Sequence, residues 1–197
     1  MEVISDSDIK KMLDNSGLKI KELYKNKHIL IHSFYDWDGG FDETDINEVI
    51  KFYMNLDEML SVVEKYLKKL GINDCILGKF YNNYWLKDWS DADKFDIYRQ
   101  LIFLLKKYRL SKNSNKGLKV NLDLGENVYL LKKIIEANFR FLSEIGMFFP
   151  EIGVYISSTH HFEVHIYTTS NDVNKHIELL NEIIAEYQNI NVLKWCK

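Results

Sequence analysis

The chain has 197 residues, of which 46% are hydrophobic and 28% charged, as in an ordinary globular protein. Its net charge is −3, and Arg occurs at only three positions. This balance disfavours direct binding of nucleic acid, because domains that bind phosphates are usually basic and read guanine through Arg. The length suits one domain over 1–197, large enough to bury a core.

Cysteine usage and the absence of targeting signals predict a cytoplasmic protein. Cys75 and Cys196 lie far apart and form no CxxC pair, which indicates reduced thiols. The N-terminus has no basic stretch followed by an apolar run, so no signal peptide is expected. No apolar run approaches the roughly 20 residues of a membrane span. Abundant Lys, Ile and Asn suggest an AT-rich genome, which favours a bacterial or phage source.

Hydrophobic periodicity predicts helices and strands that alternate along most of the chain. Helices are expected over 7–16, 44–70, 90–110, 126–145 and 171–188. Strands are expected over 28–34, 75–80, 118–124 and 190–195. The pattern over 44–70 could also be two helices, because 55–58 could cap a second segment. A flexible loop is expected at 111–117.

A β-hairpin is predicted over 152–168, where the period changes from helical to alternating. The apolar sets are Val154, Ile156 and Ser158 on one strand, and Phe162, Val164 and Ile166 on the next. Both sets can face one side only if the loop has an odd length, about three residues around Thr159. The predicted fold class is α+β: a mixed β-sheet with a C-terminal hairpin, packed by four to five helices.

The segment 33–48, SFYDWDGGFDETDINE, combines aromatic rings with six acidic side chains and no Lys or Arg. A second segment, FYNNYWLKDWSDADKFD at 80–96, repeats this mixture of rings and carboxylates. One interpretation is structural: solvated loops, acids at the positive end of the following helix, and Trp85 or Trp89 sealing a helix end. The other is a binding surface, since Tyr and Trp anchor interfaces and carboxylates steer basic partners.

The second interpretation predicts a small acidic inhibitor or immunity-type protein that covers a basic protein, such as a nuclease toxin. It requires neither a cofactor nor a catalytic group. The residues expected to contact the partner are Tyr35, Asp36, Trp37, Asp38, Phe41, Asp42, Glu43, Asp45, Tyr84, Trp85, Asp88, Trp89 and Asp91.

An enzymatic alternative comes from Asp36-Trp37-Asp38-Gly39-Gly40, directly after a predicted strand. The string resembles the first motif of haloacid-dehalogenase-type phosphohydrolases, Asp-x-Asp-Gly-Thr. The resemblance implies a Mg²⁺-dependent enzyme in which Asp36 is the nucleophile and Asp38 the acid/base. Gly40 stands where that family has Thr or Ser, and no later strand ends in paired aspartates.

The second strand of the hairpin offers another alternative. Alternation places His161, Glu163 and His165 on one face, a residue set that could bind a transition metal or provide His165 as a general base. The string from His165 to Thr168 also resembles the His-x-Thr motif of two-histidine phosphoesterases. In that motif a hydroxyl residue follows two positions after His, where this chain has Tyr167.

Overall fold

The computed structural model describes residues 1–19, 28–34, 44–80, 84–87, 94–122, 125–168 and 173–195. Within these ranges the helices are α1 Asp6–Ser16, α2 Ile46–Leu70, α3 Asp96–Lys107, α4 Gly125–Phe139 and α5 Val173–Ile184. The strands are β1 Glu2–Ile4, β2 His28–Ser33, β3 Asp74–Gly78, β4 Gly117–Asn121, β5 Gly146–Phe149, β6 Val154–Thr159, β7 Glu163–Thr168 and β8 Ile190–Trp195. None of the described helices is long and apolar enough to cross a membrane.

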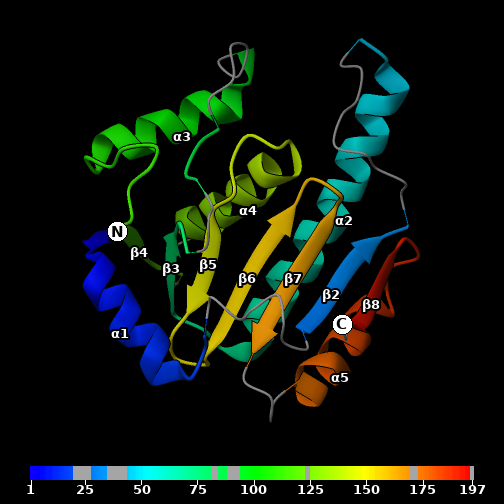
Figure 1. The fold of residues 1–197 in the computed structure, drawn as a ribbon. Helices are drawn as coiled ribbons and strands as arrows, with labels where there is room; N and C mark the ends of the chain where they lie inside the picture. The colour runs from blue at the N-terminus through cyan, green and yellow to red at the C-terminus, as the bar shows by residue number, and fades with distance from the viewer. Residues whose placement is uncertain are drawn as a thin grey trace.

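Eight strands form one sheet in the order β1-β4-β3-β5-β6-β7-β2-β8 (Figure 1). The predicted α+β class, with helices packed on a sheet that contains the C-terminal hairpin, is confirmed. A mixed sheet was expected, whereas each of the seven neighbouring pairs is antiparallel. Helices α1, α2, α4 and α5 connect strands that are not neighbours in the sheet, as β3 lies between β4 and β5, which α4 connects, whereas α3 connects the antiparallel neighbours β3 and β4.

The two faces of the sheet are covered unequally. The larger core lies on the face covered by α2, α3, α4 and α5, and it contains the apolar residues of the hairpin, Val154, Ile156, Phe162, Val164 and Ile166. On the other face α1 packs with Ile76 and Phe148 of β3 and β5. The predicted orientation of the hairpin's apolar residues is therefore confirmed.

The observed helix boundaries differ from the predicted ones mainly at the end of the sheet that is uppermost in Figure 1. The pattern over 44–70 is one helix, α2, which Asp45 caps at its start and Gly71 ends in a left-handed conformation (φ 63°). The predicted helix 126–145 stops at Phe139, and its last residues form a loop that leads into β5. The sequence analysis missed β5 because four apolar residues after a helical pattern have no period of their own.

The close approach of α1 to the sheet depends on Gly117 in β4. A Cβ at this position would lie 2.8 Å from the Leu77 carbonyl oxygen and 2.9 Å from Ile9 Cδ1. We expect Gly117→Ala to lower the free energy of unfolding by about 1–3 kcal/mol, because α1 or the strand must shift. Gly78→Ala is the control, since its Cβ would lie 3.4 Å from Phe80 Cζ, an ordinary contact. Equal losses in urea unfolding would contradict this account.

Candidate functional site

Most residues of the predicted binding surface lie outside the described part of the chain. They are Tyr35, Asp36, Trp37, Asp38, Phe41, Asp42, Glu43, Asp88, Trp89 and Asp91. The alternative catalytic pair, Asp36 and Asp38, belongs to this group. The structure does describe Asp45, Tyr84 and Trp85, and it describes the residues that flank both acidic segments. The flanks show where the two segments are attached to the fold.

Both segments are attached at the same end of the sheet, which is uppermost in Figure 1. We call it the upper end and define it by Phe34, 44–54, 84–87, 94–97 and 140–145. The Phe34 N–H donates to the Asn189 carbonyl at 2.8 Å, where the first segment leaves β2. Residues 84–87, which lie within the second segment, bond to the loop after α4. Lys87 N–H donates to the Leu142 carbonyl at 2.9 Å, and Glu144 N–H donates to the Tyr84 carbonyl at 3.1 Å.

Arg140, one residue beyond α4, contacts the helices into which the two segments lead, α2 and α3. Its side chain is buried, and its guanidinium carbon lies 5.5 Å from the Tyr53 ring centroid and 5.6 Å from that of Phe95. A guanidinium N–H also donates to the Tyr53 hydroxyl at 2.6 Å. Tyr53 lies in the second turn of α2 and Phe95 caps α3, so one buried cation fixes two helix starts relative to each other.

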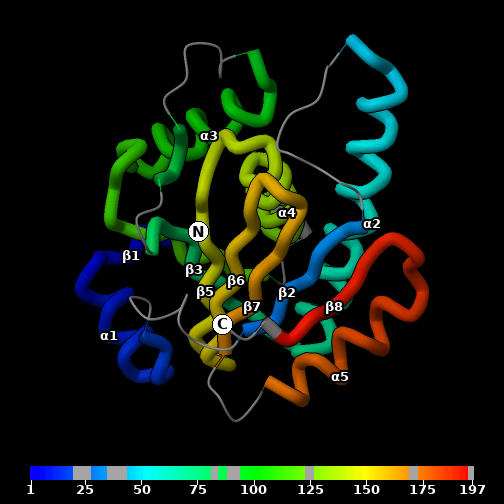
Figure 2. The backbone as a smooth tube through the Cα atoms, turned by 45° about the vertical axis from the view of Figure 1, so that its right-hand side comes forward, coloured from blue at the N-terminus to red at the C-terminus, as the bar shows by residue number. Residues whose placement is uncertain are grey.

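The first turns of α2 extend beyond the ends of β2 and β8 in both views (Figures 1 and 2). Large apolar side chains are exposed there: Ile46 is 64% exposed, Ile50 51% and Met54 62%. Phe34, at the end of β2, is also exposed. Exposed apolar residues at helical spacing beside acidic sequence are typical of an interaction surface more than of a solvated helix.

The three described residues of the predicted surface have different environments. Asp45 caps α2, since its Oδ1 accepts the Asn47 N–H at 2.9 Å, so this carboxylate stabilises the helix whether or not it also binds a partner. Trp85 is 1% exposed and its indole N–H donates to the Ser114 carbonyl at 3.0 Å. Its ring therefore has no surface to offer a partner in this structure and seals the core beside α3. Tyr84 is half-buried, and its hydroxyl donates to Glu144 at 3.2 Å.

The proposed metal set of the hairpin is not assembled. Glu163 and His165 lie on the face of β7 opposite the larger core, but His161 lies in the three-residue turn, where strand alternation has ended. The His161 ring contacts that of His160 in a tilted arrangement, with centroids 4.0 Å apart and an interplanar angle of 42°. In the described part of the chain, no three His, Cys, Asp or Glu side chains converge as metal ligands. His161, Glu163 and His165 are therefore not brought together as one set of metal ligands in this structure.

His165 is instead the middle of a hydrogen-bonded chain. Its Nε2 lies 3.3 Å from a carboxylate oxygen of Glu163, which also accepts the Thr159 hydroxyl at 3.1 Å. Its Nδ1 lies 3.0 Å from Nε2 of buried His28 in β2. Since the carboxylate can only accept, the His165 proton belongs on Nε2, and His28 donates to Nδ1. The hydrogen bond from His165 lowers the pKa of Glu163, and Thr159 contributes less.

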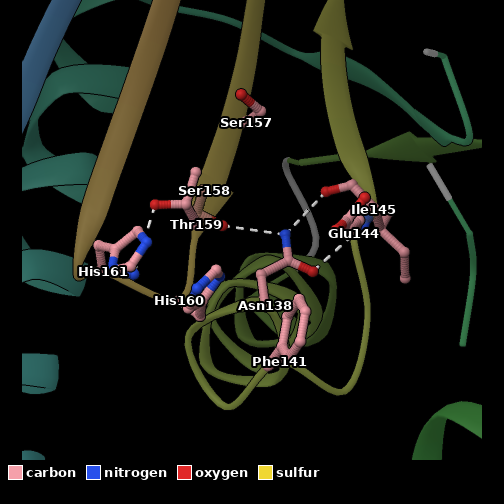
Figure 3. Close-up of a pocket in the computed structure, with 9 residues that line it drawn as sticks. All are labelled: Asn138, Phe141, Glu144, Ile145, Ser157, Ser158, Thr159, His160 and His161. Atoms are coloured by element: carbon pink, nitrogen blue, oxygen red, sulfur yellow. Dashed lines mark hydrogen bonds between the residues drawn. The ribbon is translucent and has the colours of Figure 1, made fainter. Parts of the chain in front are cut away.

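A pocket of about 190 Å³ opens where β5 and β6 separate, between the hairpin turn and the loop after α4 (Figure 3). Glu144, Phe141, Ser157, His160 and His161 contribute to its lining. Burial raises the pKa of Glu144, and the Tyr84 hydrogen bond and the positive charge of Lys87 offset this only in part. The pocket thus contains a carboxylate whose ionised form is poorly solvated and incompletely compensated.

Three rings in tilted contact form one side of this pocket. The Phe141 and His160 centroids are 4.5 Å apart, and the His161 ring contacts His160 in turn. The Lys87 ammonium nitrogen lies 2.9 Å from the Phe141 centroid. Burial lowers the pKa of His160, and the charges of His161 and Lys87 lower it further. His160 is therefore neutral at pH 7 and presents a flat uncharged ring.

Asn138, the penultimate residue of α4, holds the pocket in shape and is 2% exposed. Its amide nitrogen donates to the Ile145 carbonyl and to the Ser158 hydroxyl, both at 2.9 Å (Figure 3). Its amide oxygen accepts the Ile145 N–H at 3.2 Å and the Ser143 hydroxyl. This one side chain thus links the end of α4 to the loop before β5 and to β6.

The sequence analysis missed Arg140, Asn138, Glu144 and His28. The first three lie in a stretch that it assigned to a continuous helix, so their polar groups looked solvent-facing. A buried Asn and Arg so close to Phe139 and Phe141 could have suggested a helix end, because isolated polar residues in an apolar stretch need partners. No sequence signal could have paired His28 with His165, since that contact depends on the order of strands.

Comparison with known proteins identifies no relatives: no family model matches the chain, and neither a curated protein nor a solved structure is significantly similar to it. The function must therefore be inferred from the upper end of the sheet and its chemistry.

Replacing Arg140 tests whether it fixes the upper end. Arg140→Met keeps an apolar stem against the rings but loses the Tyr53 hydrogen bond. Among the described residues, it leaves Lys133 as the ion-pair partner of buried Glu136. We expect urea unfolding to show a loss of about 3 kcal/mol, as for breaking a buried ion pair. Arg99→Met is the control, because the Arg99–Asp96 pair is exposed. A loss as small as that of the control would mean that Arg140 does not organise this end.

Glu144 and Glu163 should affect stability with opposite dependence on pH. The pKa of the Glu144 carboxyl is higher in the folded protein than in the unfolded chain. Its contribution to the free energy of unfolding is therefore present at low pH and is lost as the pH rises through the folded-state pKa. Glu144→Gln should therefore gain stability relative to wild type between pH 4 and 7. Glu163 has a lowered folded pKa, so its contribution is present above about pH 4.3 and lost as pH falls. Glu163→Gln should be less stable than wild type at pH 7, with the difference shrinking towards pH 3.5. Urea midpoints across this range would refute the assignment if both variants changed in the same direction.

Proposed function

We propose that the protein is a cytoplasmic binding module that covers a basic protein with the upper end of its sheet, as an inhibitor or immunity-type protein does. The observation that carries this proposal is the attachment of both acidic-aromatic segments to one end, through Arg140 and the loop after α4. Two segments that are separated by 31 residues of the chain can then act on one partner.

The distribution of charge supports a basic partner. The stretches 35–48 and 88–96 together carry ten acidic residues and one Lys, whereas the whole chain has a net charge of only −3. The rest of the chain is therefore net positive, and the negative charge is concentrated in two short stretches. Such a field attracts a basic protein and disfavours acidic ones, mainly through the association rate.

Exposed apolar side chains at the same end supply binding affinity that charge alone does not provide. Ile46, Ile50 and Met54 lie on the projecting turns of α2, directly after the first acidic stretch. Interfaces gain most of their affinity from a few apolar anchors surrounded by polar contacts. A rigid helix end that presents such anchors also loses little conformational entropy on binding.

Two matched triple variants can separate the effect of where the acidic residues lie from the effect of net charge on binding. The first changes Asp36, Asp38 and Asp42 to Asn. The second makes Asp14→Asn, Glu151→Gln and Glu182→Gln, three exposed acids elsewhere. Against purified basic proteins, including nucleases and the product of the adjacent gene, we expect salt-sensitive binding that the first variant weakens far more than the second.

Ile50→Ser should weaken the same binding without lowering the free energy of unfolding, because the side chain is half exposed in the free protein. Acidic proteins of similar size serve as negative controls for the panel. The proposal fails if no basic protein binds, or if both triple variants weaken binding equally, since net charge alone would then explain the effect.

A further inference from the structure

We propose that the pocket between the hairpin turn and the loop after α4 binds the guanidinium group of an arginine side chain, with Glu144 as its carboxylate partner (Figure 3). Its biological role rests on the proposed function, because a basic partner would supply the arginine. The binding chemistry itself rests only on the pocket.

The size and position of the pocket fit one inserted side chain. Its volume of about 190 Å³ is below the roughly 300–1,000 Å³ typical of pockets for drug-sized ligands. It lies at the upper end, beside residues 84–87 of the second acidic segment. Central, partly desolvated pockets that receive one Arg or aromatic side chain are the usual energetic centres of interfaces.

Glu144 supplies an acceptor with bonding capacity to spare. Among the described residues, the Tyr84 hydroxyl donates the hydrogen bond that reaches its carboxylate. An ionised carboxylate has about four acceptor positions and can take two parallel N–H bonds from one guanidinium. The surroundings also make the ionised form unfavourable in the free protein, since burial raises the pKa of Glu144. A stable cation in the pocket would reverse that effect.

The aromatic rings of the pocket favour arginine over lysine. Phe141, His160 and His161 present flat aromatic groups along the pocket. A planar guanidinium stacks on such rings while its N–H groups reach a carboxylate, which a compact ammonium cannot do in the same way. His160 favours this role at neutral pH because its lowered pKa keeps it uncharged.

The position of Lys87 shows that this site accommodates a cation. The charge of Lys87 also lowers the affinity of the site for a second cation. Its ammonium group lies over Phe141 and acts electrostatically on both Glu144 and His160. Burial lowers the pKa of Lys87, so its charge is not well solvated there. An incoming guanidinium competes with this internal charge, so removing the Lys87 charge should strengthen binding.

The protonation states of Glu144 and His160 should control guanidinium binding at this site. The titratable groups that face it are Glu144 and Tyr84, Lys87 beside Phe141, His160 and His161 in the turn, and Glu163 next to them. Binding requires an ionised Glu144, and a neutral His160 favours it. Because burial raises the pKa of Glu144 and lowers that of His160, affinity for a guanidinium should increase as the pH rises from acidic values to 7.5.

The experiment is an NMR titration of the ¹⁵N-labelled full chain at pH 7.5 with N-acetyl-arginine amide. N-acetyl-citrulline amide, which is nearly isosteric and uncharged, is the matched probe. We expect saturable shifts of the amides at 141–145 and 158–161 with the arginine compound, and binding at least roughly tenfold weaker with the citrulline compound. The arginine affinity should fall between pH 7.5 and 5.

Three variants complete the test. Glu144→Gln should weaken arginine binding roughly tenfold, and Glu151→Gln, the same change in the exposed turn at the opposite end, should leave it unchanged. Lys87→Met should strengthen arginine binding. This gain would show that a substitution at the pocket does not weaken binding simply by damaging the pocket. Absence of saturable shifts, equal binding of the two probes, or equal binding by Glu144→Gln would overturn the proposal. Because no protein partner is used, these outcomes are independent of whether a basic protein binds the acidic segments.

Discussion

The upper end of the molecule depends on the burial of Arg140 among three helices. Its guanidinium lies 4.7 Å from the Phe52 ring centroid as well as close to Tyr53 and Phe95, and its charge is opposed by Glu136. A buried cation is tolerated only when its donors and its charge are compensated, so these groups must hold their positions together. The start of α2, the start of α3 and the end of α4 are therefore fixed as a unit.

That constraint gives the two acidic segments a common base. The first segment begins at Phe34, which bonds to Asn189, and ends on α2, where Arg140 contacts Tyr53. The second is held by the loop after α4 at residues 84–87 and by Arg140 at Phe95. Clustered carboxylates repel one another, which costs the free protein some stability, and Glu144 adds a carboxylate that burial makes harder to ionise. Groups that are unfavourable in the free protein but placed together at one end are typical of binding surfaces, because a complementary partner relieves the penalty.

Periodicity was a good guide where one face of an element is buried. The alternation over the hairpin correctly placed Phe162, Val164 and Ile166 in the core, since a register slip would have exposed all of them. The same alternation failed for His161, because a turn does not continue the pleat. It could not reveal β5, whose run of four residues is too short, nor the strand order that brings His28 to His165.

The candidate site was predicted only in outline, for physical reasons. Composition located the acidic segments because clustered charge is visible along the chain, but ring burial is not. Trp85 looked like an interface anchor and proves to be part of the core. Arg140 and Asn138 gain their roles from partners on other elements, so no local pattern could show them. Glu144 becomes unusual only because the fold buries it beside Tyr84.

The most direct test of a shared binding surface is hydrogen–deuterium exchange on the protein alone and in complex with a basic protein that binds it. The account predicts that peptides covering 35–48 and 84–96 become protected together, while the turn at 150–153, at the opposite end, does not change. Protection of only one segment, or protection centred on that turn, would contradict the claim that the upper end forms one interface.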